Sequence, residues 1–170
     1  ILTIRNPLNL GGANNSTPGA LDLYGGTFQV RINGGGNNGT IVIGNQASNG
    51  INVNLLGHTT VDVGQASATT GNAIQIGDLN LSMATMSVTG ANSYRLKVAG
   101  TTTIQGQWTD IVSNSLAPSG AVEIAGPLVG SGTLYKRTTG TIVGTDNRTL
   151  ILSSNNSATT GPNAFTGNIV

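Results

Sequence analysis

Short triplets in which apolar and polar residues alternate recur along the whole chain, and many of them are closed by Gly or Asn. Alternation with a period of two points one side chain toward a core and the next toward solvent, as in a half-buried β-strand. Val and Ile are frequent in the triplets, and Gly interrupts most windows long enough for an amphipathic helix. The pattern therefore predicts an all-β chain. The triplets are LDL at 21–23, IVI at 41–43, VDV at 61–63, LNL at 79–81, LKV at 96–98, VEI at 122–124 and TIV at 141–143.

Successive triplets begin about 20 residues apart, and further strand-like runs lie between them. Those runs are TFQVRI at 27–32, INVNLL at 51–56, AIQI at 73–76 and TTTIQGQW at 101–108. Two or three short strands in each unit, with Gly or Asn at the bends, are typical of a solenoid coil, because both residues tolerate the left-handed backbone of sharp corners. We therefore expect a parallel β-helix, or β-solenoid, with coils of about 20 residues. Stacked Asn side chains are expected to hydrogen-bond between its coils.

Residues 1–170 are interpreted as a single β-solenoid segment of a longer repetitive chain or filament. Neither ILTIRNPL at the start nor FTGNIV at the end resembles the cap that a solenoid end needs. At about 20 residues a coil, the segment would hold roughly eight coils and form a rod on the order of 40 Å long. An antiparallel β-sandwich or jelly roll is the alternative, since short strands separated by regular turns agree with it too.

Charge is scarce: only 8% of the residues are charged, against roughly 25% in an ordinary soluble domain. The net charge is +1 and the seven basic residues are scattered, with Lys136 and Arg137 the only adjacent pair, so no basic face is expected for nucleic acid. The absence of cysteine excludes thiolate metal sites and thiol catalysis, and it agrees with a secreted bacterial protein. No apolar run reaches the roughly 18 residues of a membrane span. We expect an extracellular or bacterial cell-surface location, without membrane insertion of this segment.

Residues 130–170 contain a G-x-L-x-K stretch, an L-x-L strand, an Asn and a Phe-Thr-Gly segment that ends in Val. The matching positions are Gly132, Leu134, Lys136, Leu150, Leu152, Asn155, Phe165, Thr166, Gly167 and Val170. This order resembles the autotransporter-associated β-strand repeat, and GALDLYGGTFQVR at 19–31 is similar to a strand pair of the same large surface proteins. The stretches TTGTIVGTDNR and SATTGPN depart from the repeat because they are longer. The resemblance implies a right-handed parallel β-helix in an exported adhesin-like or autotransporter passenger-like protein, without enzymatic activity of its own.

Acidic residues occupy the middle of three triplets, at Asp22, Asp62 and Glu123. With coils of 20 residues, two coils separate Asp22 from Asp62, or about 9.5 Å. That distance is near the upper limit for the carboxylate pair of an inverting glycosidase. The middle residue of such a triplet points outward, however, and an isolated outward carboxylate keeps a chain soluble. We therefore assign no catalytic residue and expect no enzyme, with a polysaccharide lyase or glycosidase as the alternative.

The remaining candidates for chemistry lead to structural assignments. His58 is the only histidine and is expected at a turn after a strand, where a zinc site would have to rest on carboxylates. The loop at 33–40 is Gly-rich but lacks the Lys-Ser/Thr ending of a phosphate loop, and the loop at 11–19 lacks the Asp of a calcium-binding nonapeptide. We predict no cofactor and no metal-binding residue. Five aromatic residues are expected to fill the core or cap it one by one, instead of forming a sugar platform: Tyr24, Phe28, Tyr94, Trp108 and Tyr135.

These observations predict a structural component of an extracellular fibre or stalk, built from stacked coils and usable for adhesion. Its expected partners are adjoining repeats or further copies of the same chain, stacked end to end, and surface glycans are a further candidate. A phage tail fibre or spike is another alternative, and it would require a trimer.

Overall fold

The computed structural model describes residues 1–6, 19–44, 49–64, 69–106, 109–113, 121–138, 150–153 and 165–170. Every strand pair in these ranges is parallel, and none of their residues is helical. The predicted parallel β-solenoid is therefore confirmed, and the antiparallel sandwich is excluded. The triplet at 141–143, Trp108 and all but the last residue of the loop at 11–19 lie outside the described residues.

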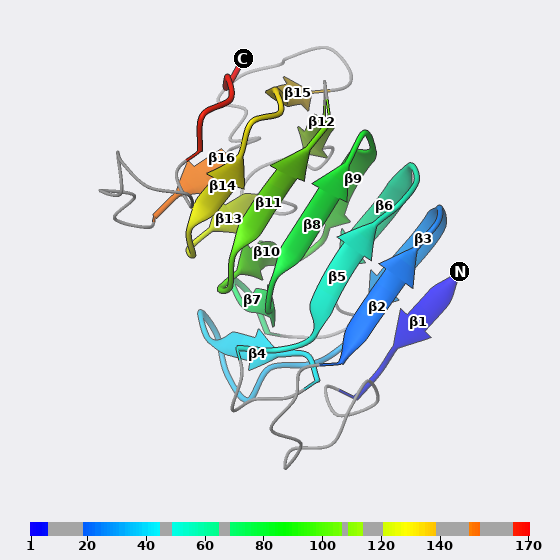
Figure 1. Ribbon diagram of the computed structural model, residues 1–170. Helices are drawn as coiled ribbons and strands as arrows, with labels where there is room; N and C mark the ends of the chain where they lie inside the picture. The colour runs from blue at the N-terminus through cyan, green and yellow to red at the C-terminus, as the bar shows by residue number, and fades with distance from the viewer. Residues whose placement is uncertain are drawn as a thin grey trace.

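Three sheets form the sides of the solenoid (Figure 1). Sheet A contains β1 (Leu2–Ile4), β3 (Gly26–Val30), β6 (Thr59–Val63), β9 (Thr85–Gly90), β12 (Thr109–Ser113) and β15 (Leu134–Thr138). Sheet B contains β2 (Ala20–Leu23), β5 (Asn52–Leu55), β8 (Leu79–Ser82), β11 (Thr102–Gln105) and β14 (Leu128–Gly130). Sheet C contains β4 (Thr40–Val42), β7 (Ala73–Ile76), β10 (Arg95–Val98), β13 (Val122–Ile124) and β16 (Leu150–Leu152).

The chain passes through sheets C, B and A in turn, so each coil contributes one strand to each side. Four coils have all three of their strands described, β4–β6, β7–β9, β10–β12 and β13–β15, and strands of further coils lie at both ends. The strands of sheet B lie side by side at the front of Figure 1. Near the C-terminus, Phe165 pairs with Gly130 on sheet B and Ile169 pairs with Leu134 on sheet A, so this segment continues the stack.

The coils are longer than predicted. Partners in adjacent coils lie about 26 residues apart, as Thr102 and Leu128 do. The predicted spacing of about 20 residues is the distance along the chain between every second strand. The triplets at 21–23, 41–43 and 61–63 correspond to β2, β4 and β6, which lie on sheets B, C and A. This spacing therefore measures two sides of a three-sided coil. The six strands of sheet A rise by about 24 Å in place of the predicted rod of about 40 Å.

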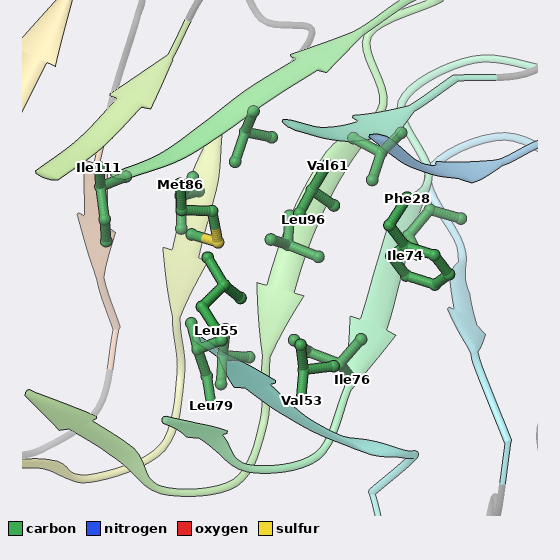
Figure 2. Packing of buried hydrophobic residues seen from close by; sticks show 14 of the residues in the cluster. Phe28, Val53, Leu55, Val61, Ile74, Ile76, Leu79, Met86, Leu96 and Ile111 are labelled. Carbon is green, nitrogen blue, oxygen red and sulfur yellow. The ribbon is translucent and has the colours of Figure 1, made fainter. Parts of the chain in front are cut away.

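Columns of aliphatic side chains fill the interior, because inward positions repeat in register from coil to coil (Figure 2). On sheet B, Leu23, Leu55, Leu81 and Ile104 form one such buried column. A void of about 10 Å³ remains where this column meets the other two sheets, beside Phe28 and other core side chains. That volume is at the lower limit for one water molecule. The interior at this level therefore has no room for a ligand.

Polar side chains satisfy the backbone at the corner between sheets C and B. Asn52 Oδ1 accepts a hydrogen bond of 2.8 Å from the N–H of Asp78, and Asp78 Oδ1 accepts one of 2.7 Å from the N–H of Thr101 in the following coil. The next residue in this column is Pro127, which has no N–H to satisfy. Asn or Asp thus stands at this corner where the residue in register in the following coil has a backbone N–H that needs an acceptor.

Candidate functional site

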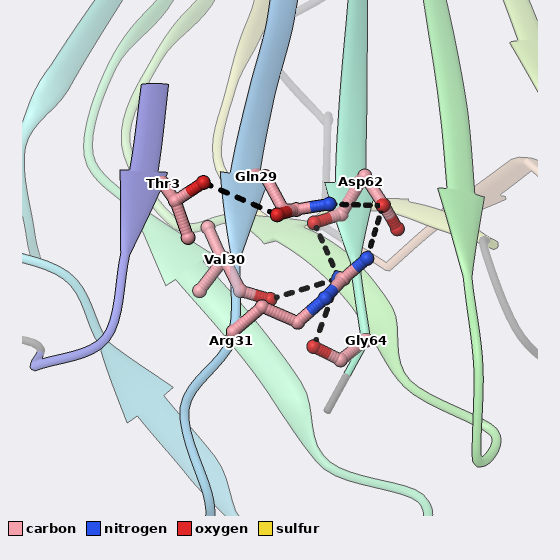
Figure 3. A network of polar contacts seen from close by, with 6 residues as sticks. All are labelled: Thr3, Gln29, Val30, Arg31, Asp62 and Gly64. Carbon is pink, nitrogen blue, oxygen red and sulfur yellow. Dashed lines mark hydrogen bonds and ion pairs between the residues drawn. The ribbon is translucent and has the colours of Figure 1, made fainter. Parts of the chain in front are cut away.

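Asp62 is the centre of a polar network on the outer face of sheet A (Figure 3). Its carboxylate pairs with the guanidinium of Arg31, and Gln29 Nε2 donates to Asp62 Oδ2 at 3.1 Å. Thr3 Oγ1 donates to Gln29 Oε1 at 3.2 Å, which extends the network to β1. Arg31 Nη1 also donates to the carbonyl of Gly64 at 3.1 Å. The network therefore joins β1, β3 and β6, and sequence reasoning missed Arg31 because it lies 31 residues from Asp62.

Two further ion pairs also join different coils. Arg95 Nε on β10 lies 2.9 Å from Glu123 Oε2 on β13, and Ser153 Oγ in the next coil donates to Glu123 Oε1 at 3.0 Å. Arg137 Nε on β15 lies 2.9 Å from Asp110 Oδ1 on β12, in an electrostatic contact without hydrogen-bond geometry. Each of the three ion pairs found in the described part of the chain crosses from one coil to its neighbour.

The pKa of Asp62 and the pKa of Glu123 both lie below their ordinary values. Burial by itself raises the pKa of Asp62, but hydrogen bonds from Arg31 and Gln29 and the charge of Arg31 lower it by more. Burial likewise raises the pKa of Glu123, and the hydrogen bond and charge of Arg95 are foremost among the contacts that outweigh it. Both carboxylates are therefore suited to be charged members of ion pairs, whereas a general acid at neutral pH needs a raised pKa.

Acid is expected to destabilise the solenoid through these two carboxylates. Because their folded-state pKa values are lowered, the folded chain binds fewer protons than the unfolded chain, and stability rises with pH where the two differ. The contribution is complete above the pKa of the unfolded groups and is lost as the pH falls below about 4 through the folded-state values. Urea unfolding at about pH 7 and about pH 3 measures the loss, which should be smaller in Asp62→Asn by roughly 1 kcal/mol. An equal loss in the wild type and in Asp62→Asn would contradict this assignment.

Asp22 does not approach Asp62, contrary to the arrangement expected from a 20-residue coil. Asp22 lies in β2 on sheet B and Asp62 in β6 on sheet A, because the coil has three sides and a longer period. The hypothetical glycosidase pair is therefore not formed. Asn54 Nδ2 donates to Asp22 Oδ1 at 2.7 Å, and Asn80 Nδ2 donates to Asn54 Oδ1 at 2.7 Å. This row of Asp22, Asn54 and Asn80, called the outer ladder below, confirms the predicted stacking of Asn side chains between coils.

His58 is exposed at the corner between β5 and β6, as predicted for a turn. Its Nδ1 accepts a hydrogen bond of 3.1 Å from the backbone N–H of Thr85 in the next coil. A search of the described ranges finds no cluster of three or more His, Asp or Glu residues able to hold a metal ion.

The aromatic residues divide into two groups. Phe28 and Tyr94 are buried, which confirms that they fill the core. Tyr24 is 77% exposed, so the prediction that it fills the core or caps it is wrong. Tyr135 lies on the outer face of sheet A, with the guanidinium of Arg137 5.0 Å from its ring centre.

The Gly-rich loop at 33–40 is organised by Asn72, which sequence reasoning missed, together with the hydroxyl of Tyr94. Asn72 Nδ2 donates to Tyr94 Oη at 2.8 Å and to the carbonyl of Gly36 at 2.9 Å, and Asn72 Oδ1 accepts from the N–H of Gly39 at 2.6 Å. Asn72 and Tyr94 are both fully buried. A local signal for Asn72 was available, because it stands two residues before the inward Ile74, at a position where alternation predicts an apolar side chain. Side-chain hydrogen bonds therefore give this corner a defined structure.

Comparison of the chain with protein-family models finds no match, and neither the curated proteins nor the solved structures give a significant match. Within the described ranges, no helix is long and apolar enough to cross a membrane. The fold defines the class, a three-sided parallel β-solenoid, and the resemblance of residues 130–170 to the autotransporter-associated repeat stays a prediction.

Proposed function

We propose that the chain is a structural segment of an extracellular or cell-surface fibre or stalk, in which stacked coils provide stiffness. Three parallel ladders run along the described coils, and their backbone hydrogen bonds lie along the axis of the stack. The observation that carries the proposal is the placement of charge. In a chain with few charges, the three ion pairs of the described residues each tie one coil to the next.

The two rims of the segment are proposed to meet adjoining repeats or further copies of the chain, stacked end to end. Inward positions that are buried in the middle coils are exposed at the rims: Leu2 is 41% exposed beside buried Phe28, and Leu152 is 45% exposed beside buried Ile124. A further coil would remove this apolar surface from water and give the edge strands partners. Because the two rims differ, such a contact joins head to tail, and stacking of copies along the solenoid axis forms an open rod instead of a ring.

Sedimentation velocity and electron microscopy of the native assembly test the stacking of copies. We expect rods whose length increases with protein concentration, because a head-to-tail contact propagates. Leu152→Lys should shorten the rods, since it places a charge on an apolar rim. Thr60→Lys, on the outer face of sheet A, should leave their length unchanged. Monomers at every concentration would contradict the stacking of copies, and a closed trimer would favour the phage-fibre alternative.

A catalytic role is tested separately. We expect no cleavage of neutral polysaccharides or of uronates, because Asp22 and Asp62 lie on different sheets and do not form a carboxylate pair. The assay follows reducing ends for hydrolysis and unsaturated products for lyase action. Cleavage that is lost in Asp22→Asn or Asp62→Asn would contradict the structural proposal.

A further inference from the structure

Three exposed apolar side chains lie along one corner of the solenoid, where sheet B turns toward sheet A. Tyr24, Leu56 and Met83 are 77%, 45% and 55% exposed. The register of β2 with β5 places Tyr24 beside Leu56, and the register of β5 with β8 places Met83 one level further on, beside Gly57 and one position along from Leu56. These strands lie at the front of Figure 1. Exposed apolar side chains that gather in one place mark interaction sites more often than scattered ones do. These three residues are called the corner strip.

Met83 in the corner strip has a backbone conformation that favours glycine. Its φ is +49°, in the left-handed region, where an L side chain costs free energy. The residues in register with it in other coils are Gly25, Gly57, Gly106 and Gly132. Gly106 leaves space for the methionine, since a Cβ at that position would lie 2.4 Å from Met83 Cγ. A large side chain is therefore held at a strained position where glycine occurs in the neighbouring coils, and such strain is concentrated at functional sites.

The outer ladder runs parallel to the corner strip on the same face of sheet B. Asp22 precedes Tyr24 by two residues, and Asn54 precedes Leu56 in the same way, so the two rows are adjacent. The hydrogen bonds of the ladder use Asp22 Oδ1 and Asn54 Oδ1. Among the contacts of the described residues, Asp22 Oδ2 and Asn80 Oδ1 have no hydrogen-bond donor. The surface thus combines an apolar row with a row that offers unused acceptors.

We propose that the corner strip and the outer ladder together bind a neutral glycan chain that lies along the solenoid axis. The apolar faces of sugar rings pack on Tyr24, Leu56 and Met83, and sugar hydroxyls donate to the unused oxygens of the ladder. Asp22 carries the only charge of the six side chains, so the surface complements hydroxyl donors and repels uronates and phosphorylated sugars. The levels of the ladder repeat at about 4.8 Å, close to the length of one extended sugar unit. Successive sugars therefore each meet one polar side chain of the ladder.

A protein partner agrees less well with the size of this surface. The corner strip spans two strand spacings, or about 10 Å, whereas a stable protein interface buries about 800 Å² on each partner. A narrow ligand is favoured for that reason. The inference adds a ligand to the proposed surface fibre and rests on that function only for its biological setting.

Isothermal titration of the whole chain with neutral oligosaccharides of glucose, N-acetylglucosamine, mannose and xylose tests the proposal, with oligogalacturonate as the acidic probe. We expect at least one neutral series to bind and oligogalacturonate not to bind. Tyr24→Ala should weaken the binding by about tenfold or more. Tyr135→Ala removes the outward tyrosine of sheet A and serves as the matched control, with unchanged affinity.

Met83→Gly separates binding from folding. The release of backbone strain should raise the melting temperature by about 2 °C or more, while the loss of the side chain should weaken glycan binding by about threefold or more. If Met83 served only for packing, Met83→Gly would lower the melting temperature. That result would contradict the role of Met83 in the corner strip.

The inference is overturned if no neutral probe binds, if oligogalacturonate binds more tightly, or if Tyr24→Ala keeps the wild-type affinity. Self-association of the wild type that Tyr24→Ala abolishes would also overturn it and would assign the strip to a second copy of the chain. A failure to bind glycans leaves the fibre proposal untouched, because Leu152→Lys tests rod assembly at the opposite rim from Tyr24.

Discussion

Gly126→Ala is expected to lower the free energy of unfolding by more than about 3 kcal/mol or to prevent folding altogether. A Cβ at Gly126 would lie 1.9 Å from the carbonyl oxygen of Gly100 in the preceding coil. The atom that it meets belongs to the backbone, and its coil is hydrogen-bonded to further coils on both sides. The clash therefore cannot be relieved by a side-chain rotation, and relief requires the stack to open at this corner.

The matched control for this prediction is Gly35→Ala. Gly35 is exposed, and a Cβ there would meet no atom within 4 Å, so the expected change is below about 0.5 kcal/mol. Urea unfolding followed by circular dichroism measures both variants. Equal stability of Gly126→Ala and Gly35→Ala would show that the coils do not approach each other closely at this corner.

Asn72→Leu is expected to lower the free energy of unfolding by about 3 kcal/mol or more. Leucine has a similar size but removes every polar group, which leaves the N–H of Gly39, the carbonyl of Gly36 and the hydroxyl of Tyr94 without the hydrogen bonds that Asn72 makes. Asn72 and Tyr94 are fully buried, so water does not replace the lost bonds at the tyrosine hydroxyl without a rearrangement of the corner.

Asn54→Leu provides the control for Asn72→Leu. Asn54 also hydrogen-bonds between coils, but it lies in the outer ladder, where water reaches its neighbours. The expected cost is therefore below about 1 kcal/mol. Urea unfolding compares the two, and the amide resonance of Gly39 should shift in Asn72→Leu alone. A cost of Asn72→Leu no larger than that of Asn54→Leu would contradict the structural role of the buried asparagine.

The strands and the side of each strand that faces the core could be predicted from the sequence. The triplet LDL at 21–23 points Leu inward and Asp outward, and the same holds for VEI at 122–124. This succeeds because alternation with a period of two is a local property, set by the geometry of an extended backbone. That Asn side chains stack between coils could be predicted as a general property of stacked coils, but which Asn residues meet depends on the coil length and could not.

Coil length and the partners of each side chain were decided only by the tertiary structure. Asp62 meets Arg31 from 31 residues away, whereas Glu123 meets Arg95 from 28 residues away, and no constant period predicts both pairs. The lengths of the corner loops set these separations, and loop length tolerates change at little cost in free energy, so it leaves no regular mark on the sequence. Local alternation therefore determined which side chains face the core and which face solvent. The packing of three sides around one core determined which residues meet between coils.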